Sequence, residues 1–447
     1  MIIPSVAKPL LLQFSFAFTA PTFQRFGALM LSAILTTGRR TVSNMLRTVP
    51  ALTPGDGSSY RRIFSKRRWL SIKLGQALTR YIIQHYLPEG PISLAVDDTV
   101  DEHRGKKVYG KACHRDAVRS SHSYTAYRWG HKWVVLVILI KFPWASRPWA
   151  LPVLVALYHS KESNKECGRR HKTPPVIARQ LLAVLQRWFP ERTFILAGDG
   201  GFSTHDLASS ARRRRRGGAV LVGRFYPHAN LYAPPPQKRA HTGRPRIKGR
   251  KLPAPQTVVA KTRKRTRLTV PWYGGQTRKV EVVTGEGQWY RMGQGLVAVR
   301  WIFVHDLSGT HRDEYFFSTD VQMTPQQIIE TFTGRWSIEV TFEEMRAYLG
   351  LETTRGWIRQ TVLRMAPCLF GLYSVVALLF DLLPAKQKKA TVCWDKKSTV
   401  TFSDAITVVR RWLWREWVFE TCGHQAAFSK LSPDFQELLN YAMAPAA

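Results

Sequence analysis

The pentapeptide Arg335-Trp336-Ser337-Ile338-Glu339 lies inside residues 331–350, a stretch with the composition and spacing of an α-helix. Residues three or four positions apart on a helix are neighbours, so one face of this helix would be rich in charge. A carboxylate between two arginines is a poor choice for a buried stabilising group. It is well suited to a metal ion that holds a phosphate. The residues of this face are Phe332, Arg335, Glu339, Glu343 and Arg346.

Two further acidic residues stand at the ends of apolar runs, where the strands of a sheet are expected. Asp98 follows the run 92–96, and Asp199 ends the run that begins at residue 194. Two strand-end aspartates and a helix glutamate can hold two Mg²⁺ ions, because magnesium prefers oxygen ligands. Asp98, Asp199 and Glu339 are therefore the predicted catalytic residues and metal ligands, with two Mg²⁺ ions as the cofactor and Mn²⁺ as an alternative ion.

Asp97 directly precedes Asp98 on the same predicted strand. Neighbours on a strand point to opposite faces, so only one of the two can enter the site. We assign Asp98 to the metal ions and Asp97 to a supporting position, and leave the reverse assignment open. Purely structural explanations also exist, because Asp199 can be a turn residue and Glu339 can pair with Arg335 on the helix.

The charge of the chain indicates its partner. It has 67 basic and 30 acidic residues, for a net charge of +37. So large an excess is costly self-repulsion unless a polyanion neutralises it, which favours a nucleic-acid partner and salt-dependent binding. The hydrophobic content of 45% and the aromatic content of 12% exclude a disordered basic tail.

The cysteines and apolar segments exclude other classes of protein. Five widely spaced cysteines form no CxxC pair, and Cys113-His114 and Cys422-Gly423-His424 are isolated. We therefore expect neither a disulfide framework nor a structural zinc site. The most apolar segment, residues 367–383, contains Gly371 and Asp381, which favours a buried core helix over a membrane span. The N-terminal apolar run is interrupted by Gln13 and Ser15, and we do not interpret it as a signal peptide.

With 447 residues, the chain is expected to form two or three domains. Residues 1–90 are predicted to be a helical DNA-binding region. A turn at residues 37–41 between two helices is compatible with helix-turn-helix binding of DNA through Arg39 and Arg40, and equally with an ordinary helical hairpin. Residues 351–447 are predicted to form a helical C-terminal region.

Residues 91–350 alternate between strand and helix patterns, which predicts a mixed α/β sheet. The basic, proline-containing segment at about 226–313 interrupts this alternation and is predicted to be an inserted antiparallel β subdomain. The strands are expected at 92–98, 132–141, 149–158, 193–199, 219–225 and 314–319, with short inserted strands at 257–260, 267–271, 278–283 and 296–305.

The Arg335–Glu339 pentapeptide, with Phe332 before it and Arg346 after it, resembles the YREK signature of bacterial insertion-sequence transposases of the DDE group. Phe332 replaces the usual tyrosine and Arg346 the usual lysine. The segments 94–99 and 198–202 are similar to the two aspartate motifs of the same group. The resemblance covers residues 91–350 and implies a catalytic domain with the ribonuclease-H-like fold shared with retroviral integrases.

The resemblance also implies a function. The expected enzyme is a Mg²⁺-dependent endonuclease that moves an insertion sequence by cut-and-paste DNA transposition, through strand nicking, a hairpin at the element end, and strand transfer. Arg335 would hold a phosphate near the hairpin, Trp336 could stack on a distorted base, and a tryptophan of the insertion could hold a flipped base. The expected DNA-binding residues are Arg335, Trp336, Arg346, Phe332, Arg39 and Arg40, and the tryptophan candidates are Trp272, Trp289 and Trp301, although core packing is the better explanation for Trp301.

The expected partners are the inverted repeats at the element ends and the target DNA, with a dimer assembled on DNA. Neither a nucleotide cofactor nor a membrane is expected, and the location would be the cytoplasm, at the bacterial nucleoid. Two alternatives remain: another nuclease on the same fold, and a non-catalytic DNA-binding regulator derived from a transposase. A regulator would be expected to lose acids, yet all three are present.

Overall fold

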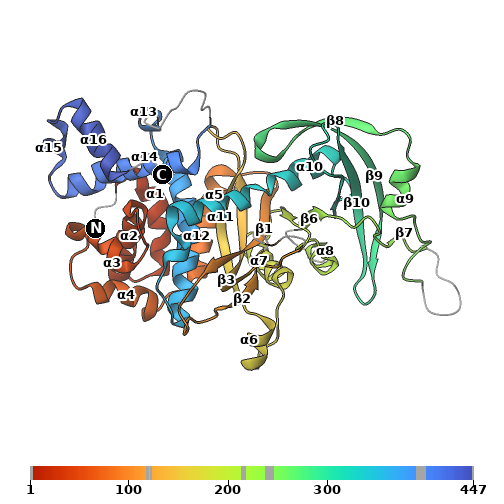
Figure 1. Ribbon diagram of the computed structural model, residues 1–447, viewed down its shortest axis with the longest axis horizontal. Helices are drawn as coiled ribbons and strands as arrows, with labels where there is room; N and C mark the ends of the chain where they lie inside the picture. Colours follow the sequence, from red (N-terminus) through yellow and green to blue (C-terminus); the bar gives the residue numbers. More distant parts are fainter. Residues whose placement is uncertain are drawn as a thin grey trace.

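A mixed sheet runs through the middle of the protein, with helices around one half and an inserted β region at the other end (Figure 1). The computed structural model describes residues 4–116, 120, 123–212, 218–236, 246–388 and 399–444. In these residues the sheet has eleven strands. The predicted α/β fold class, with a mixed sheet and helical terminal regions, is confirmed.

The core of the sheet has the strand order β4-β3-β1-β5-β6. The strands β1, β3 and β4 are antiparallel, whereas β5 and β6 run parallel to β1. All five strands were predicted, and β1 and β3 extend further than expected. Their bounds are β1 (Ile92–Glu102), β3 (Tyr127–Ile140), β4 (Trp149–Tyr158), β5 (Phe194–Gly198) and β6 (Ala219–Arg224).

The centre of the sheet is buried on both faces. Residues Trp133 to Ile138 of β3 have no exposed surface, which explains their unbroken apolar sequence. α7 (Pro174–Trp188) packs on β3 and β4. β4 is also covered by α5 (Ser71–Tyr86), α11 (Ser337–Leu349) and α12. α12 (Arg359–Leu382) is long and apolar enough to cross a membrane, but 72% of its most apolar window is buried within the protein. It is the core helix that the sequence predicted.

The inserted region continues the core sheet. β11 pairs with β6 on one side and with β10 on the other, so the order runs β6-β11-β10-β9-β7, and β8 also pairs with β9. The predicted strand at 257–260 is wrong: these residues lie in α9, where Pro255 occupies the first turn and favours a helix start. The bounds are β7 (Leu231–Tyr232), β8 (Thr266–Pro271), α9 (Pro255–Lys261), β9 (Thr277–Arg291), β10 (Gly295–Asp306) and β11 (Glu314–Ser318).

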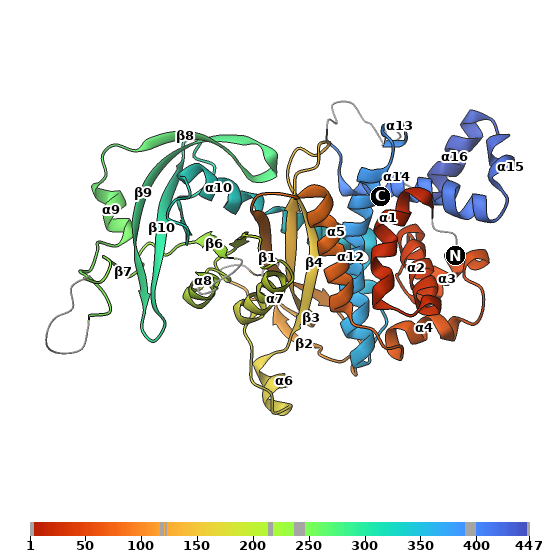
Figure 2. The ribbon, with the colours of Figure 1, turned by 180° about the vertical axis from the view of Figure 1, so that it is seen from behind.

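The N- and C-terminal regions pack together as one helical body (Figure 2). α2 contacts α3, α4, α12 and α14, and α5 lies against β4, where Gly75 allows the close approach: a Cβ atom there would come within 2.4 Å of the Val153 carbonyl oxygen. The larger helices are α2 (Ala20–Leu35), α3 (Val42–Thr48), α4 (Gly57–Ser65), α5 (Ser71–Tyr86) and α14 (Phe402–Leu413). The remaining helices are α1 (Lys8–Leu11), α6 (Lys161–Glu166), α8 (His205–Arg212), α13 (Ala385–Lys388), α15 (Gln425–Ser429) and α16 (Pro433–Met443). A short strand, β2 (Ala112–Arg115), pairs with β3 at the edge of the sheet.

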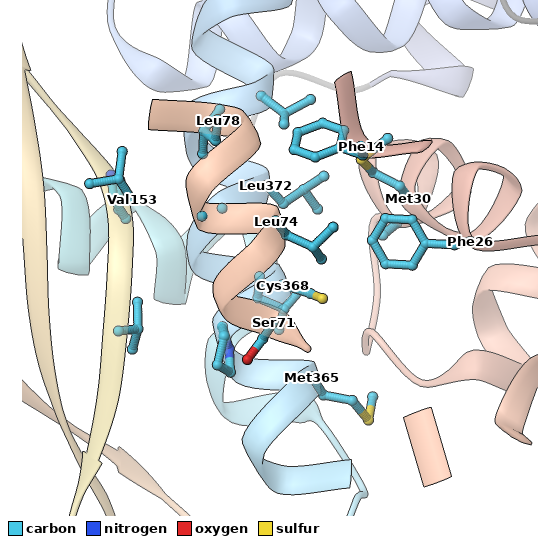
Figure 3. Close-up of a pocket in the computed structure, with 18 of the residues that line it drawn as sticks. Phe14, Phe26, Met30, Ser71, Leu74, Leu78, Val153, Met365, Cys368 and Leu372 are labelled. Carbon is cyan, nitrogen blue, oxygen red and sulfur yellow. The ribbon is translucent and has the colours of Figure 1, made fainter. Parts of the chain in front are cut away.

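An apolar cavity of about 280 Å³ lies between this helical body and β4, which lines it with residues such as Val153 (Figure 3). Phe14, Phe26 and Met30 line it from the N-terminal helices, and Leu74 and Leu372 from α5 and α12. It contains none of the predicted acidic residues, so it is a feature of the helical packing.

Arg40 anchors the turn between α2 and α3 instead of projecting from it. The side chain is 2% exposed, and its guanidinium donates to the carbonyl oxygens of Gly38 (2.6 Å) and Tyr348, the latter at the end of α11. Burial and the nearby Arg410 lower the pKa of Arg40 to about 9. The predicted DNA contact of Arg40 is therefore not available to this side chain, whereas Arg39 is exposed.

We expect Arg40→Ala to destabilise the protein by about 3 kcal/mol or more, because it leaves several buried carbonyl groups without a donor. The adjacent Arg39→Ala is the matched control, since an exposed arginine contributes within about 0.5 kcal/mol. Chemical denaturation of the two variants measures the difference. Equal stabilities would contradict the anchoring role.

Candidate active site

The register of two parallel strands brings Asp97 and Asp199 to one face of the sheet. β1 and β5 are paired so that Val96 lies beside Gly198. Asp97 is the next residue on β1, and Asp199 is the first residue after β5. Neighbouring residues of parallel strands point to the same face. The two carboxylates are close enough for the charge of Asp199 to act on the pKa of Asp97. The carboxyl pair of the site is therefore Asp97 and Asp199.

Arg335 joins the third acid to this pair. Its Nη1 donates to Asp97 Oδ2 at 2.8 Å, and its Nη2 donates to Glu339 Oε1 at 2.7 Å. The guanidinium is 8% exposed, whereas the Glu339 side chain is 47% exposed. Arg335 Nε has no hydrogen-bond partner among the described residues. One buried cation therefore holds two of the acids together and keeps one donor free.

The helix that carries Arg335 and Glu339 is interrupted. The sequence predicted one helix, but the structure has α10 (Pro325–Gly334) and α11 (Ser337–Leu349). At the junction the N–H groups of Arg335 and Trp336 bond to carbonyls three residues back, as in a 3₁₀ turn. Glu339 thus lies in the first turn of α11, where a negative charge is favourable.

Asp98 lies on the other face of β1. Its Oδ1 pairs with Lys132 Nζ at 2.8 Å, and this lysine belongs to β3. The structure brings Asp97, and not Asp98, into contact with Arg335. The two aspartates point to opposite faces, as expected. The geometry favours Asp97 as the metal ligand, which the sequence left as the alternative to Asp98.

Asp199 combines a turn role with its place in the site. Its Oδ1 accepts from the N–H groups of Gly201 (2.9 Å) and Phe202 (3.2 Å). These bonds fix the loop that follows β5. The side chain remains partly exposed, so the carboxylate keeps oxygen lone pairs for a ligand.

The environment perturbs the ionisation of Asp97. Burial raises its pKa, the Arg335 charge opposes this rise, and the charges of Asp199 and Asp98 add to it, which gives a pKa of about 7. Crowded carboxylates of this kind gain from a cation that neutralises them. The oxygen-only donor set of Asp97, Asp199 and Glu339 fits a hard divalent ion.

The other predicted DNA-binding residues differ in their accessibility. Phe332 is buried and stacked on Phe316, with ring centroids 4.2 Å apart, so its side chain packs the core and does not offer a DNA contact. Arg346 donates to Thr99 Oγ1 and pairs with Glu352 at 3.4 Å. Trp336 is partly exposed.

The inserted region supplies a residue that the sequence did not single out. Burial and the Glu314 charge raise the pKa of Tyr273, and the charges of Arg335 and Glu339 also act on it, which places Tyr273 beside the site. The three tryptophans expected to hold a flipped base are all buried: Trp272, Trp289 and Trp301. No sequence signal distinguished Tyr273 from the other aromatic residues, because its position depends on how the insertion folds back.

Comparison with known proteins identifies the family. The sequence model of the DDE superfamily endonucleases matches residues 13–279, and that of the archaeal putative transposase ISC1217 matches residues 285–375. A solved structure of a piggyBac transposase synaptic complex with hairpin DNA aligns over 98% of this chain and 81% of that chain, with 9% identity and a TM-score of 0.39. No curated protein matches the chain. Since the first match spans more than half of the sequence, the chain belongs to the DDE superfamily of endonucleases, and the predicted resemblance to insertion-sequence transposases is confirmed.

Proposed function

We propose that this endonuclease is a transposase that excises an insertion sequence from DNA and joins it to a target by metal-dependent strand cleavage, hairpin formation and strand transfer. The observation that carries the proposal is the placement of three acids. Asp97 and Asp199 share one face of adjacent parallel strands, and Arg335 connects Asp97 to Glu339. Such a cluster suits polynucleotidyl transfer assisted by two metal ions.

In this proposal Asp97 takes the metal-ligand role that the sequence assigned to Asp98. Asp97, Asp199 and Glu339 would hold two Mg²⁺ ions, which supply a nucleophile at neutral pH and stabilise the leaving oxygen. Arg335, which binds Asp97 and Glu339, would supply positive charge beside a DNA phosphate held by these ions. Asp98, paired with Lys132, would support the strand from the far face.

The DNA path is proposed from exposed basic residues. Arg39 stands on the turn before α3, and Arg61, Arg62 and the basic run 66–68 are exposed on and after α4. These residues are suited to phosphate contacts, which position DNA without reading its sequence. In the same proposal, two copies of the protein assemble as a dimer on two element ends. They act on DNA of the nucleoid and need no nucleotide cofactor. A regulator without catalysis has no such need for a charged cluster around Arg335.

Excision is the direct test of the function. Inverted repeats that bracket the reading frame identify the element ends, and purified protein is then incubated with a labelled duplex that contains one end. Cleavage at the end in Mg²⁺, followed by a hairpin product, would support the proposal. Binding of the end without any cleavage in Mg²⁺ or Mn²⁺ would favour the regulator.

The adjacent aspartates provide a matched pair of variants. We expect Asp97→Asn to slow end cleavage about a thousandfold or more, because a lost metal ligand removes several kcal/mol of charge stabilisation. Asp98→Asn should slow it less than about tenfold. A gel assay of nicking measures both, with end binding as the check on folding. The opposite order of effects would return the ligand role to Asp98.

The pKa of Asp97 predicts how metal binding depends on pH. Because this pKa is raised to about 7, a proton competes with the ion below that pH. Mn²⁺ affinity should therefore fall about tenfold per pH unit below 7 and level off above it. Electron paramagnetic resonance of free Mn²⁺ measures the affinity between pH 6 and 8. Asp97→Asn should bind more weakly and lose the dependence, and an unchanged slope in that variant would implicate another group.

Trp336 provides a test of the hairpin step. It is partly exposed and adjacent to Arg335, so its ring can reach a base next to the phosphate. Trp336→Ala should leave nicking detectable and deplete the hairpin product on a pre-nicked end. Phe332→Tyr is the control, because the Phe332 ring is buried in the core. This substitution should affect neither nicking nor hairpin formation selectively. A normal hairpin yield from Trp336→Ala would exclude the stacking role.

A further inference from the structure

A second cluster of metal-binding side chains lies at the far end of β1, away from the three acids. Asp101 and His103 lie at the end of this strand, and His131 stands directly opposite Asp101 on β3. The three residues are 0%, 8% and 2% exposed. Their ligand atoms all lie within 4.8 Å of one another. The proposed transposase function assigns no role to any of them.

The hydrogen bonds of His131 leave a lone pair that faces a carboxylate. His131 Nε2 lies 2.9 Å from the carbonyl oxygen of Tyr109, which can only accept, so this nitrogen carries the proton. In a neutral ring, Nδ1 then has a lone pair, and it lies 3.5 Å from Asp101 Oδ1. An ion bound to both Nδ1 and Oδ1 would join the imidazole to the carboxylate.

The spacing of the ligand atoms fits one metal ion. Bonds of about 2.0–2.1 Å in a tetrahedral zinc site place neighbouring ligand atoms about 3.3 Å apart. The observed separations are 3.2 Å from His103 Nε2 to Asp101 Oδ2 and 3.5 Å from His131 Nδ1 to Asp101 Oδ1. Without an ion, His103 Nε2 would donate to Asp101 Oδ2 and a second proton on His131 would satisfy the other contact. A single ion would instead bind all three side chains at once.

The contacts around the cluster have the form of outer hydrogen bonds to metal ligands. The Tyr109 carbonyl fixes the tautomer of His131. The indole N–H of Trp133 donates to Asp101 Oδ2 at 3.2 Å, and the His131 backbone N–H donates to Oδ1 at 3.0 Å. Ligating imidazoles and carboxylates are commonly oriented by such partners.

We propose that Asp101, His103 and His131 bind one first-row transition-metal dication, with Zn²⁺ as the best match, in a structural site separate from the catalytic carboxylates. A cavity of about 10 Å³ borders His103, His131 and Trp133, and this volume holds one water molecule at most. The water would complete a four-coordinate site, and no space remains for a substrate. The ion would fasten the end of β1 to β3 and to the segment that contains Tyr109.

Metal analysis of the full-length protein tests the proposal. Protein purified without a histidine tag and dialysed against Mg²⁺ should retain one Zn²⁺ per chain by mass spectrometry. Replacement of the ion by Co²⁺ should give the visible absorption of a tetrahedral site. Chelation should lower the melting temperature. No zinc retained or bound on titration, with no tetrahedral Co²⁺ spectrum, would overturn the proposal, as would an NMR spectrum showing a doubly protonated His131 in the metal-free protein at neutral pH.

Matched variants locate the ion. His103→Ala should weaken Zn²⁺ binding about tenfold or more. His114→Ala is the control, because His114 is a buried histidine of the adjacent strand β2 that is not part of the cluster. Glu339→Gln should also leave Zn²⁺ binding unchanged, although it should abolish cleavage. Unchanged zinc affinity in a folded His103→Ala protein would contradict the site, and loss of zinc in Glu339→Gln would place the ion at the catalytic acids. If His103→Ala does not fold, the Co²⁺ spectrum and zinc stoichiometry of the unmodified protein still decide the question.

Discussion

The alternation of side chains along β1 places three polar contacts on one face of a single strand. Asp97, Thr99 and Asp101 are two residues apart, so they point the same way. Arg335, at the junction before α11, binds Asp97, and Arg346 of α11 binds Thr99. Asp101 contacts His131 on β3. The position of α11 over β1 is therefore set by two arginines that each find an acceptor on that face.

Arg335 also resolves an electrostatic difficulty of the site. Three carboxylates near one another repel, and the raised pKa of Asp97 shows how strongly burial and its acidic neighbours act. A buried arginine with two carboxylate partners offsets this repulsion without a metal ion, because each charged hydrogen bond is stronger than a neutral one. Arg335 therefore contributes to holding Asp97 and Glu339 in the observed arrangement.

The strand and helix pattern of the core could be predicted from the sequence, because buried strands and amphipathic helices have different periodicities. Asp199 and Glu339 were found for the same reason, at the end of a strand and on a helix. The choice between Asp97 and Asp98 could not be made. Residues Leu94, Ala95 and Val96 are all fully buried, so no polar-apolar alternation reveals which face of β1 holds the site. The answer depends on the pairing with β5 and on Arg335, which is 238 residues away.

The break between α10 and α11 and the helix at α9 likewise arise from local capping and packing. The Asp101 cluster has no recognisable spacing, since it forms only through the register of β1 with β3.

The continuity of the sheet has a mechanical consequence. From β9 and β10 of the inserted region to β6, β5 and β1, each strand is hydrogen-bonded to the next. A force applied to the far end of the β9–β10 hairpin would therefore pass through a stiff ladder of backbone bonds to the strands that carry Asp97 and Asp199. A flexible linker would absorb such a load. The inserted region is therefore coupled mechanically to the strands next to the candidate site, and a displacement at its far end would be transmitted there through the sheet.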